Sequence, residues 1–128
     1  MLSTVAWVLQ ALLAVTFLFH GILYTFGPEP LVRPMREQGG WPPGVPTWFR
    51  IFIGVAELLA AIGLVLSGLF HVATFLTPLA ALGLVVVLVG AAVYHVRRSE
   101  MQVLPAVLVL LLLSVVVLVV RWQVTPLS

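Results

Sequence analysis

Residues 48–67 read WFRIFIGVAELLAAIGLVLS. This run is long and apolar enough to cross a membrane as one helix, because a hydrocarbon core of about 30 Å needs about 20 helical residues. It nevertheless carries Glu57 in its interior. A carboxyl group at that depth is costly, and ionisable groups inside a membrane usually serve a function. We therefore expect a small membrane bundle organised around Glu57.

The composition of the chain also indicates a membrane protein. Of its 128 residues, 62% are apolar and 8% are charged, whereas soluble domains carry about 25% charged residues. The mean hydropathy is +1.24, and a net charge of +2 is no footprint of a nucleic-acid-binding protein. The absence of cysteine excludes disulfides, thiolate metal sites and a CxxC pair within this chain. We expect one transmembrane domain over residues 1–128.

Four apolar runs predict an all-α fold, an integral membrane four-helix bundle. The expected spans are about 3–26, 49–67, 72–95 and 103–120, with a Pro/Gly-rich cytoplasmic loop over 27–48. Valine-rich runs in the later spans would favour strands in water, but a helix satisfies its own backbone in lipid. Pro78 falls inside the third expected span, so we expect it to kink that helix.

Small residues are expected where helices touch, because lipid gives apolar side chains no reason to leave it. The sequence offers small residues in three spans: Ala14 and Gly21 in the first, Ala56, Ala60 and Gly63 in the second, and Ala73, Ala80, Gly83 and Gly90 in the third. The fourth span is almost entirely Leu and Val, so we expect it to pack against its neighbours or to face lipid. The first three spans are then expected to line any site.

The arginines predict the orientation of the bundle. Five of the six fall in or beside the loops that follow the first and third spans, and only Arg121 falls on the other side. The positive-inside rule puts those two loops in the cytoplasm and both termini outside. We expect a multi-pass protein of the inner (plasma) membrane.

His20 is the expected partner of Glu57. It lies six residues from the cytoplasmic end of the first span, or ~9 Å deep, and Glu57 lies eight residues into the second, or ~12 Å deep. Tyr24 follows His20 by one turn and shares its face. We propose Glu57 and His20 as candidate catalytic residues and Tyr24 as a ligand-binding residue. The alternative is an interhelical hydrogen bond that only specifies packing.

Three further residues complete the ligand-binding candidates. Arg50 and Gly54 share the Glu57 side of the second span at helical spacing. Arg50 either closes the cytoplasmic mouth of the pocket or extends to lipid headgroups. His95 ends the third span, and it either lines the pocket mouth or anchors the helix at the membrane surface together with the arginines that follow it.

No metal site is predicted, and the sequence names no cofactor. His20, His71 and His95 are expected at different depths, so they do not form a haem site. Only His20 and Glu57 match in depth, whereas a metal such as zinc takes three or four protein ligands. Gln10 and Thr77 are expected to make packing hydrogen bonds.

Three stretches carry a family resemblance: FLFHGILYTF at 17–26, FRIFIGVAELLAAIGLVL at 49–66 and LTPLAALGLVVVLVGAAVYHVRR at 76–98. Together they resemble the DoxX-like family of small four-helix bacterial membrane proteins. The resemblance implies links to quinone-coupled sulfur oxidation and to membrane complexes that handle oxidative stress. The family is also similar in architecture to membrane isomerases and sterol-binding proteins that place acidic residues in an apolar cavity.

Three functions follow from these observations. The favoured one is a protein that binds a quinone or similar lipophilic molecule between the first three spans, with Glu57 and His20 at the floor, and supports a redox partner. The second is an isomerase, cyclase or epoxide-opening enzyme with Glu57 as general acid. The third is a structural role. The expected partners are membrane lipids, the lipophilic molecule, and a membrane redox protein or a second copy of the chain.

Overall fold

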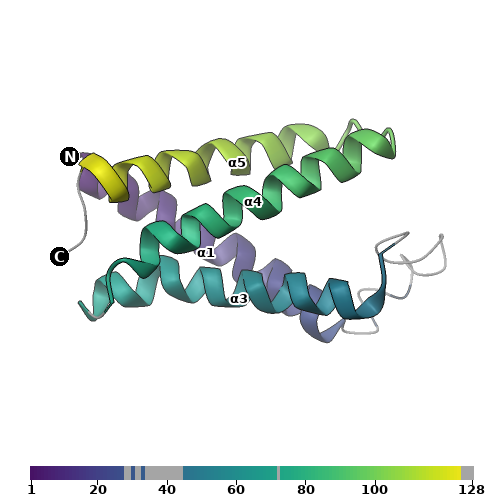
Figure 1. Ribbon diagram of the computed structural model, residues 1–128, viewed down its shortest axis with the longest axis horizontal. Helices are drawn as coiled ribbons and strands as arrows, with labels where there is room; N and C mark the ends of the chain where they lie inside the picture. Colours follow the sequence, from purple (N-terminus) through teal and green to yellow (C-terminus); the bar gives the residue numbers. More distant parts are fainter. Residues whose placement is uncertain (28–29, 31–32, 34–44, 72, 125–128) are drawn as a thin grey trace.

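The computed structural model describes residues 1–27, 30, 33, 45–71 and 73–124, and these residues form a bundle of long helices without strands (Figure 1). The helices are α1 (Leu2–Phe26), α3 (Thr47–Leu69), α4 (Leu76–Arg97) and α5 (Leu104–Val119), which continues into the π-helical η1 (Val120–Val124). All four spans, the last running over Leu104–Gln123, are long and apolar enough to cross a membrane. The predicted all-α membrane bundle is confirmed.

The start of α4 differs from the sequence-based boundary. His71 and Ala73 have φ values of 54° and 48°, a left-handed backbone that interrupts a helix, and α4 therefore begins at Leu76. Pro78 is the third residue of this helix, where the missing N–H would have had no partner in any case. The predicted kink at Pro78 is wrong for this reason. Most of the predicted loop 27–48 lies outside the described residues.

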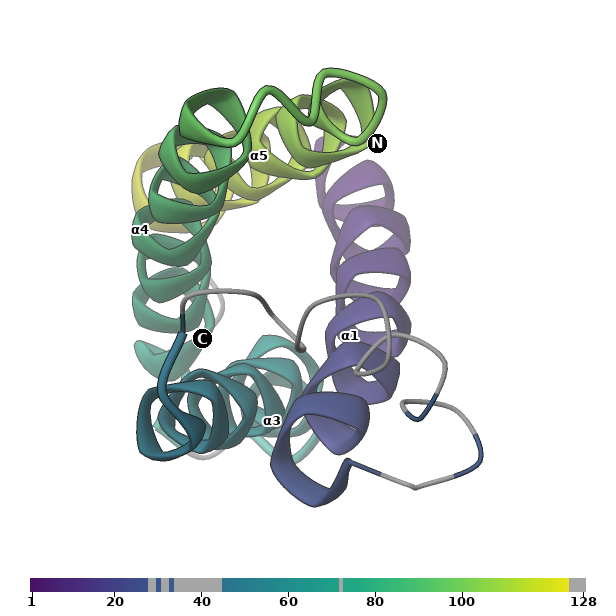
Figure 2. The ribbon, with the colours of Figure 1, turned by 90° about the vertical axis from the view of Figure 1, so that its right-hand side faces the viewer.

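The helices form a ring in which α1 contacts α3, α3 contacts α4, α4 contacts α5 and α5 returns to α1 (Figure 2). The α1–α3 contact is the most extensive, and the α5–α1 contact is the smallest of the four. The α1–α3 pair lies close to the α4–α5 pair at the end that holds residue 1 and η1, and the two pairs diverge toward the opposite end (Figure 1).

Two glycines bring α1 and α3 into backbone contact. A Cβ atom at Gly54 would lie 2.6 Å from the backbone nitrogen of Thr25, and one at Gly21 would lie 2.9 Å from the carbonyl oxygen of Gly54. In contrast, a Cβ atom at Gly83 or Gly90 would meet nothing within 4 Å. The predicted helix contacts at Gly83 and Gly90 are therefore wrong among the described residues, since no neighbouring helix covers these positions.

Arg121 connects the end of the last span to α1 through hydrogen bonds. Its side chain is 2% exposed, and it donates from Nε to Oε1 of Gln10 (2.6 Å) and from Nη1 to Oγ of Ser3 (3.0 Å). Its guanidinium lies 5.4 Å from the ring centroid of Trp7, and Gln10 donates in turn to the carbonyl oxygen of Leu64. Arg121 lies just beyond the predicted fourth span, and its hydrogen bonds pack that end of the span against α1, in agreement with the expectation that this span packs against its neighbours or faces lipid.

A second polar cluster fixes the hairpin of α3 and α4. The hydroxyls of Ser67 and Thr77 both donate to the carbonyl oxygen of Gly63 at 2.9 Å. Both hydroxyls are buried, and this arrangement satisfies them where water is absent. The packing role predicted for Thr77, and that predicted for Gln10, are confirmed.

Candidate functional site

Glu57 and His20 meet across the contact between α1 and α3. A hydrogen bond joins Nδ1 of His20 to Oε2 of Glu57 at 2.6 Å. The Glu57 side chain is 3% exposed, whereas that of His20 is 41% exposed. The contact predicted from matching depth is present, and the catalytic role suggested for both residues remains a prediction. The close packing of α1 against α3 at Gly21 and Gly54 explains this contact, because it places the side chains of His20 and Glu57 within reach of one another.

Tyr24 extends this pair by one helical turn. Its ring centroid lies 4.2 Å from that of His20, with an angle of 34° between the ring planes. The spacing of four residues puts both rings on one face of α1. Tyr24 also lies within range of electrostatic interaction with Glu57 and Arg50. The three residues singled out on α1 and α3 therefore form one cluster, and Arg50 stands beside it.

Arg50 and Gly54 have packing environments that differ from their predicted roles. Arg50 is 9% exposed, so its side chain does not extend to lipid headgroups as the more conservative interpretation expected. A Cβ atom at Gly54 would clash with Thr25, which makes Gly54 a helix-contact residue. Their ligand-binding roles remain predictions.

His95 belongs to a separate polar cluster at the turn between α4 and α5. Its Nδ1 lies 3.1 Å from Oε1 of Glu100, and Nε of Arg98 lies 3.4 Å from the same oxygen. Arg98 also stands 5.6 Å from the ring centroid of Tyr94. These contacts match the anchoring alternative for His95, because they hold the residue at the turn that ends its helix.

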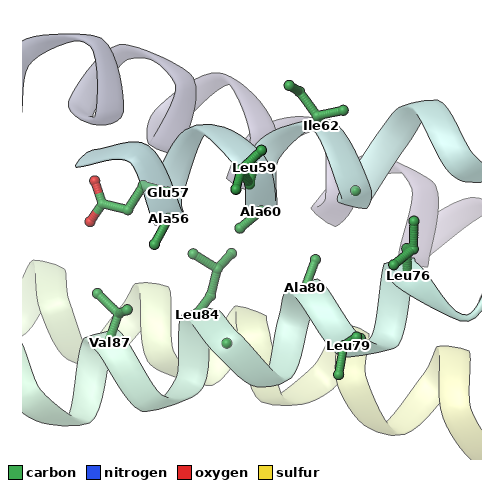
Figure 3. A pocket seen from close by; sticks show the side chains of 12 residues that line it. Ala56, Glu57, Leu59, Ala60, Ile62, Leu76, Leu79, Ala80, Leu84 and Val87 are labelled. Atoms are coloured by element: carbon green, nitrogen blue, oxygen red, sulfur yellow. The ribbon is translucent and has the colours of Figure 1, made fainter. Parts of the chain in front are cut away.

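A groove of about 410 Å³ runs between α3 and α4 (Figure 3). This volume falls in the range of small-molecule sites. Glu57 is the one lining residue with a polar side chain, and it lies at one end of the groove, with Leu76 near the other (Figure 3). The lining residues are Ala56, Glu57, Leu59, Ala60, Ile62, Gly63, Leu76, Leu79, Ala80, Gly83, Leu84 and Val87.

The groove coincides in part with the predicted pocket between the first three spans, since the second and third of these, α3 and α4, form it. No residue of α1 lines it, and His20 stands behind Glu57 rather than at its floor. α1 and α3 approach so closely at Gly21 and Gly54 that no room for a ligand is left at that point of their contact. Space remains beside Gly83, whose missing side chain leaves the surface of α4 open. In the sequence, the α4 side of this groove is indicated by the helical spacing of Ala80, Gly83, Leu84 and Val87, which puts these residues on one face.

The chemistry of this arrangement is that of a carboxyl oriented by an imidazole. Oε2 of Glu57 is engaged by His20, and no described residue makes a further hydrogen bond to Oε1 that competes with a ligand. An ionised carboxylate accepts a hydrogen bond from a hydroxyl, and a protonated one donates to a carbonyl. The His20 side chain is 41% exposed on the outer surface of α1, whereas that of Glu57 is 3% exposed.

Fold and site together define a multi-pass helical membrane protein with a carboxyl–imidazole pair at the end of an apolar intramembrane groove. The chain belongs to the DoxX-like family, whose sequence profile matches residues 8–117. The matched region includes His20, Glu57 and the whole of the groove. No match was found among curated proteins or among solved structures.

Proposed function

We propose that this protein binds a lipophilic small molecule, a quinone or a similar lipid, in the groove between α3 and α4. The observation that carries the proposal is the position of Glu57, a buried carboxyl at the end of an otherwise apolar groove. Ligand sites combine apolar walls with a few polar groups that orient the ligand. Here the 2.6 Å hydrogen bond between His20 and Glu57 holds the carboxyl in place.

We further propose that the bound molecule serves a membrane redox partner. This part rests on the resemblance to DoxX-like proteins linked to quinone-coupled oxidation. The chain has no cysteine, so electrons would pass through the bound molecule and the partner rather than through a dithiol of this chain. A second copy of the chain is the alternative partner.

A membrane enzyme is the second candidate function, and the His20–Glu57 pair is the observation that favours it. A general acid needs a proton, a partner that restores it and a reacting group within hydrogen-bond reach. A carboxyl hydrogen-bonded to an imidazole is an arrangement suited to the first two needs, and the groove offers a place for the third. Isomerisation, cyclisation or epoxide opening of an apolar substrate are the reactions that suit a buried carboxylic acid.

The ligand is tested by mass spectrometry of lipophilic compounds that co-purify with the protein. We expect a discrete species in the wild type that is reduced about tenfold or more by Glu57→Leu, since a lost hydrogen bond to a charged or buried carboxyl costs about 1.5–3 kcal/mol. Glu100→Gln is the matched control, because Glu100 lies at the turn after α4 and outside the groove. Bulk phospholipid alone in every sample would contradict the proposal.

Glu57→Gln separates the two candidate functions, because it keeps the shape and removes the acid. For a binding protein we expect the co-purified species to be retained, with modestly weaker binding. For an enzyme we expect turnover of that species to stop while binding persists. If only the melting temperature changes in Glu57→Gln and Glu57→Leu, the pair serves packing and both candidates fail.

We also propose that the protein sits in the inner membrane with both termini outside. The four candidate spans among the described residues support termini on one side of the membrane, and Arg121, the arginine nearest that side, is buried in a packing network. A cysteine introduced as Gly40→Cys should resist an impermeant maleimide in intact cells and react after lysis, because the chain contains no other thiol. Ser128→Cys should react in intact cells, and the reverse pattern would invert the orientation.

A further inference from the structure

We infer that the groove takes a single-chain lipid with a small uncharged head group, the head at Glu57 and the chain extending toward Leu76. The inference rests on the proposed function, since it assumes that the groove binds a ligand. It adds the shape and the polarity that this ligand must have. The length of the groove, its taper, the polarity of its lining and its opening toward the bilayer each support the inference.

The groove is long in one direction only. On α4 its lining runs from Leu76 to Val87, eleven residues apart, which is ~16 Å of helix. Glu57 and Leu76 mark its two ends in Figure 3. A volume of about 410 Å³ distributed over such a length is narrow. This form suits one extended chain and leaves no space for a second chain beside it.

The groove also tapers. Near Leu76 the two helices almost touch, because a Cβ atom at Gly63 would lie 3.2 Å from Cβ of Ala80. Nearer Glu57 they separate, and a Cβ atom at Gly83 would meet nothing within 4 Å. Figure 1 shows the same divergence of α4 from α3. A fused-ring molecule has similar width along its length, whereas a chain with a wider head matches this taper.

The head group must be small and uncharged. Glu57 is ten residues from the first residue of α3, which is ~15 Å from the helix end. It is the one polar side chain of the lining, so a phosphate or a sugar at this position would lose its water without replacement partners. A hydroxyl or a carbonyl needs one partner, and Oε1 of Glu57 provides it.

The ligand reaches the groove sideways from the bilayer. Leu59, Ile62 and Leu79 line it and are 63%, 48% and 48% exposed, so the groove opens on the apolar surface that faces lipid. A membrane-dissolved chain enters along this side without crossing the polar cluster at the turn between α4 and α5. The ligand therefore needs no water-filled passage.

The test uses photoreactive primary alkanols, a short one and a long one, each with a diazirine at the end of its chain. The full-length protein in micelles is labelled and digested, and the labelled peptide is identified by mass spectrometry. We expect the long probe to label the Leu76–Ala80 end of the groove and the short probe to label residues nearer Glu57. Both signals should fall in Glu57→Leu.

Gly83→Leu is the decisive variant, because its new side chain enters open space and fills the groove midway. We expect labelling by the long probe to fall about tenfold, which corresponds to the lost burial of about two methylene groups, while labelling by the short probe is kept. Gly90→Leu is the matched control: the same change, in equally open space on the same helix, outside the groove. It should leave both probes unchanged.

Two results would overturn the inference, and they separate it from the proposed function. If labelling depends on Glu57 but Gly83→Leu affects neither probe, the groove binds a compact molecule, and only the inference fails. If wild-type labelling is spread evenly over the lipid-facing surface and ignores Glu57→Leu, no ligand occupies the groove, and both fail. If Gly83→Leu does not fold, the labelling of the wild type still tests the inference, because the long probe must label the Leu76–Ala80 end and the short probe must label residues nearer Glu57.

Discussion

Gly54→Ala is expected to lower the free energy of unfolding by about 3 kcal/mol, at the upper end of the usual cost of overpacking. The added Cβ atom would lie 2.5 Å from Oγ1 and 2.6 Å from the backbone nitrogen of Thr25. A flexible side chain turns away from such a contact, but a helix backbone does not. The substitution therefore pushes α1 away from α3. Reversible unfolding in mixed micelles measures the effect.

Glycines in other surroundings provide the controls for this prediction. Gly21→Ala meets the carbonyl oxygen of Gly54 at 2.9 Å, and we expect an intermediate loss. Gly90→Ala meets nothing within 4 Å and should be neutral, or gain up to about 1 kcal/mol from the higher helix propensity of alanine. Equal effects of Gly54→Ala and Gly90→Ala would contradict the close contact of α1 and α3.

The same substitution bears on the site. Separation of α1 from α3 draws His20 away from Glu57, whose hydrogen bond spans these two helices at 2.6 Å. We therefore expect Gly54→Ala to reduce retention of the co-purified ligand as well as stability. The geometry of the His20–Glu57 pair therefore depends on Gly54, which has no side chain.

Arg121→Leu is expected to destabilise the protein by about 2 kcal/mol, because it leaves the buried Oε1 of Gln10 without its donor. Gln10 is 0% exposed, so water does not replace the lost contact. The hydrogen bonds from the guanidinium to Oγ and to the carbonyl oxygen of Ser3 are lost as well. The same unfolding measurement in mixed micelles gives the magnitude.

A double-mutant cycle with Gln10→Leu isolates this interaction. In the Gln10→Leu background no amide oxygen is left unsatisfied, so Arg121→Leu should cost less, by a coupling energy of about 0.6–2 kcal/mol. Equal losses in the two backgrounds would show that Arg121 and Gln10 act independently. Ligand retention should be unchanged in these variants, since neither residue lines the groove.

The polar residues of the bundle occupy two different environments. Gln10, Arg121, Ser67 and Thr77 are buried and bonded to one another or to backbone carbonyls, which is the usual use of polar groups between membrane helices. Glu57 differs, since it borders the groove as well as bonding to His20. This difference is the physical ground for preferring a ligand-binding role to a purely structural one at Glu57.

The membrane-bundle fold could be predicted from the sequence because it depends on length and polarity alone. A bilayer demands about 20 apolar residues for each crossing and requires the backbone to satisfy itself, so apolar runs and their spacing determine four helices. The same depth argument brought His20 and Glu57 together, since residues at equal depth on neighbouring antiparallel helices are placed to meet. The number of spans and the depth of a residue both depend only on the sequence and on the thickness of the bilayer.

Only the tertiary structure decided which faces of the helices meet. Gly21, Gly54, Gly83 and Gly90 look alike in the sequence, yet the first two form the closest helix contact and the last two face open space. Arg121 looked like a topological signal and is a buried donor to Gln10. Depth is set by counting residues from a helix end, whereas rotation about each helix axis is set by packing against several neighbours at once. The groove therefore lies between α3 and α4, a position that no single stretch of the sequence specifies.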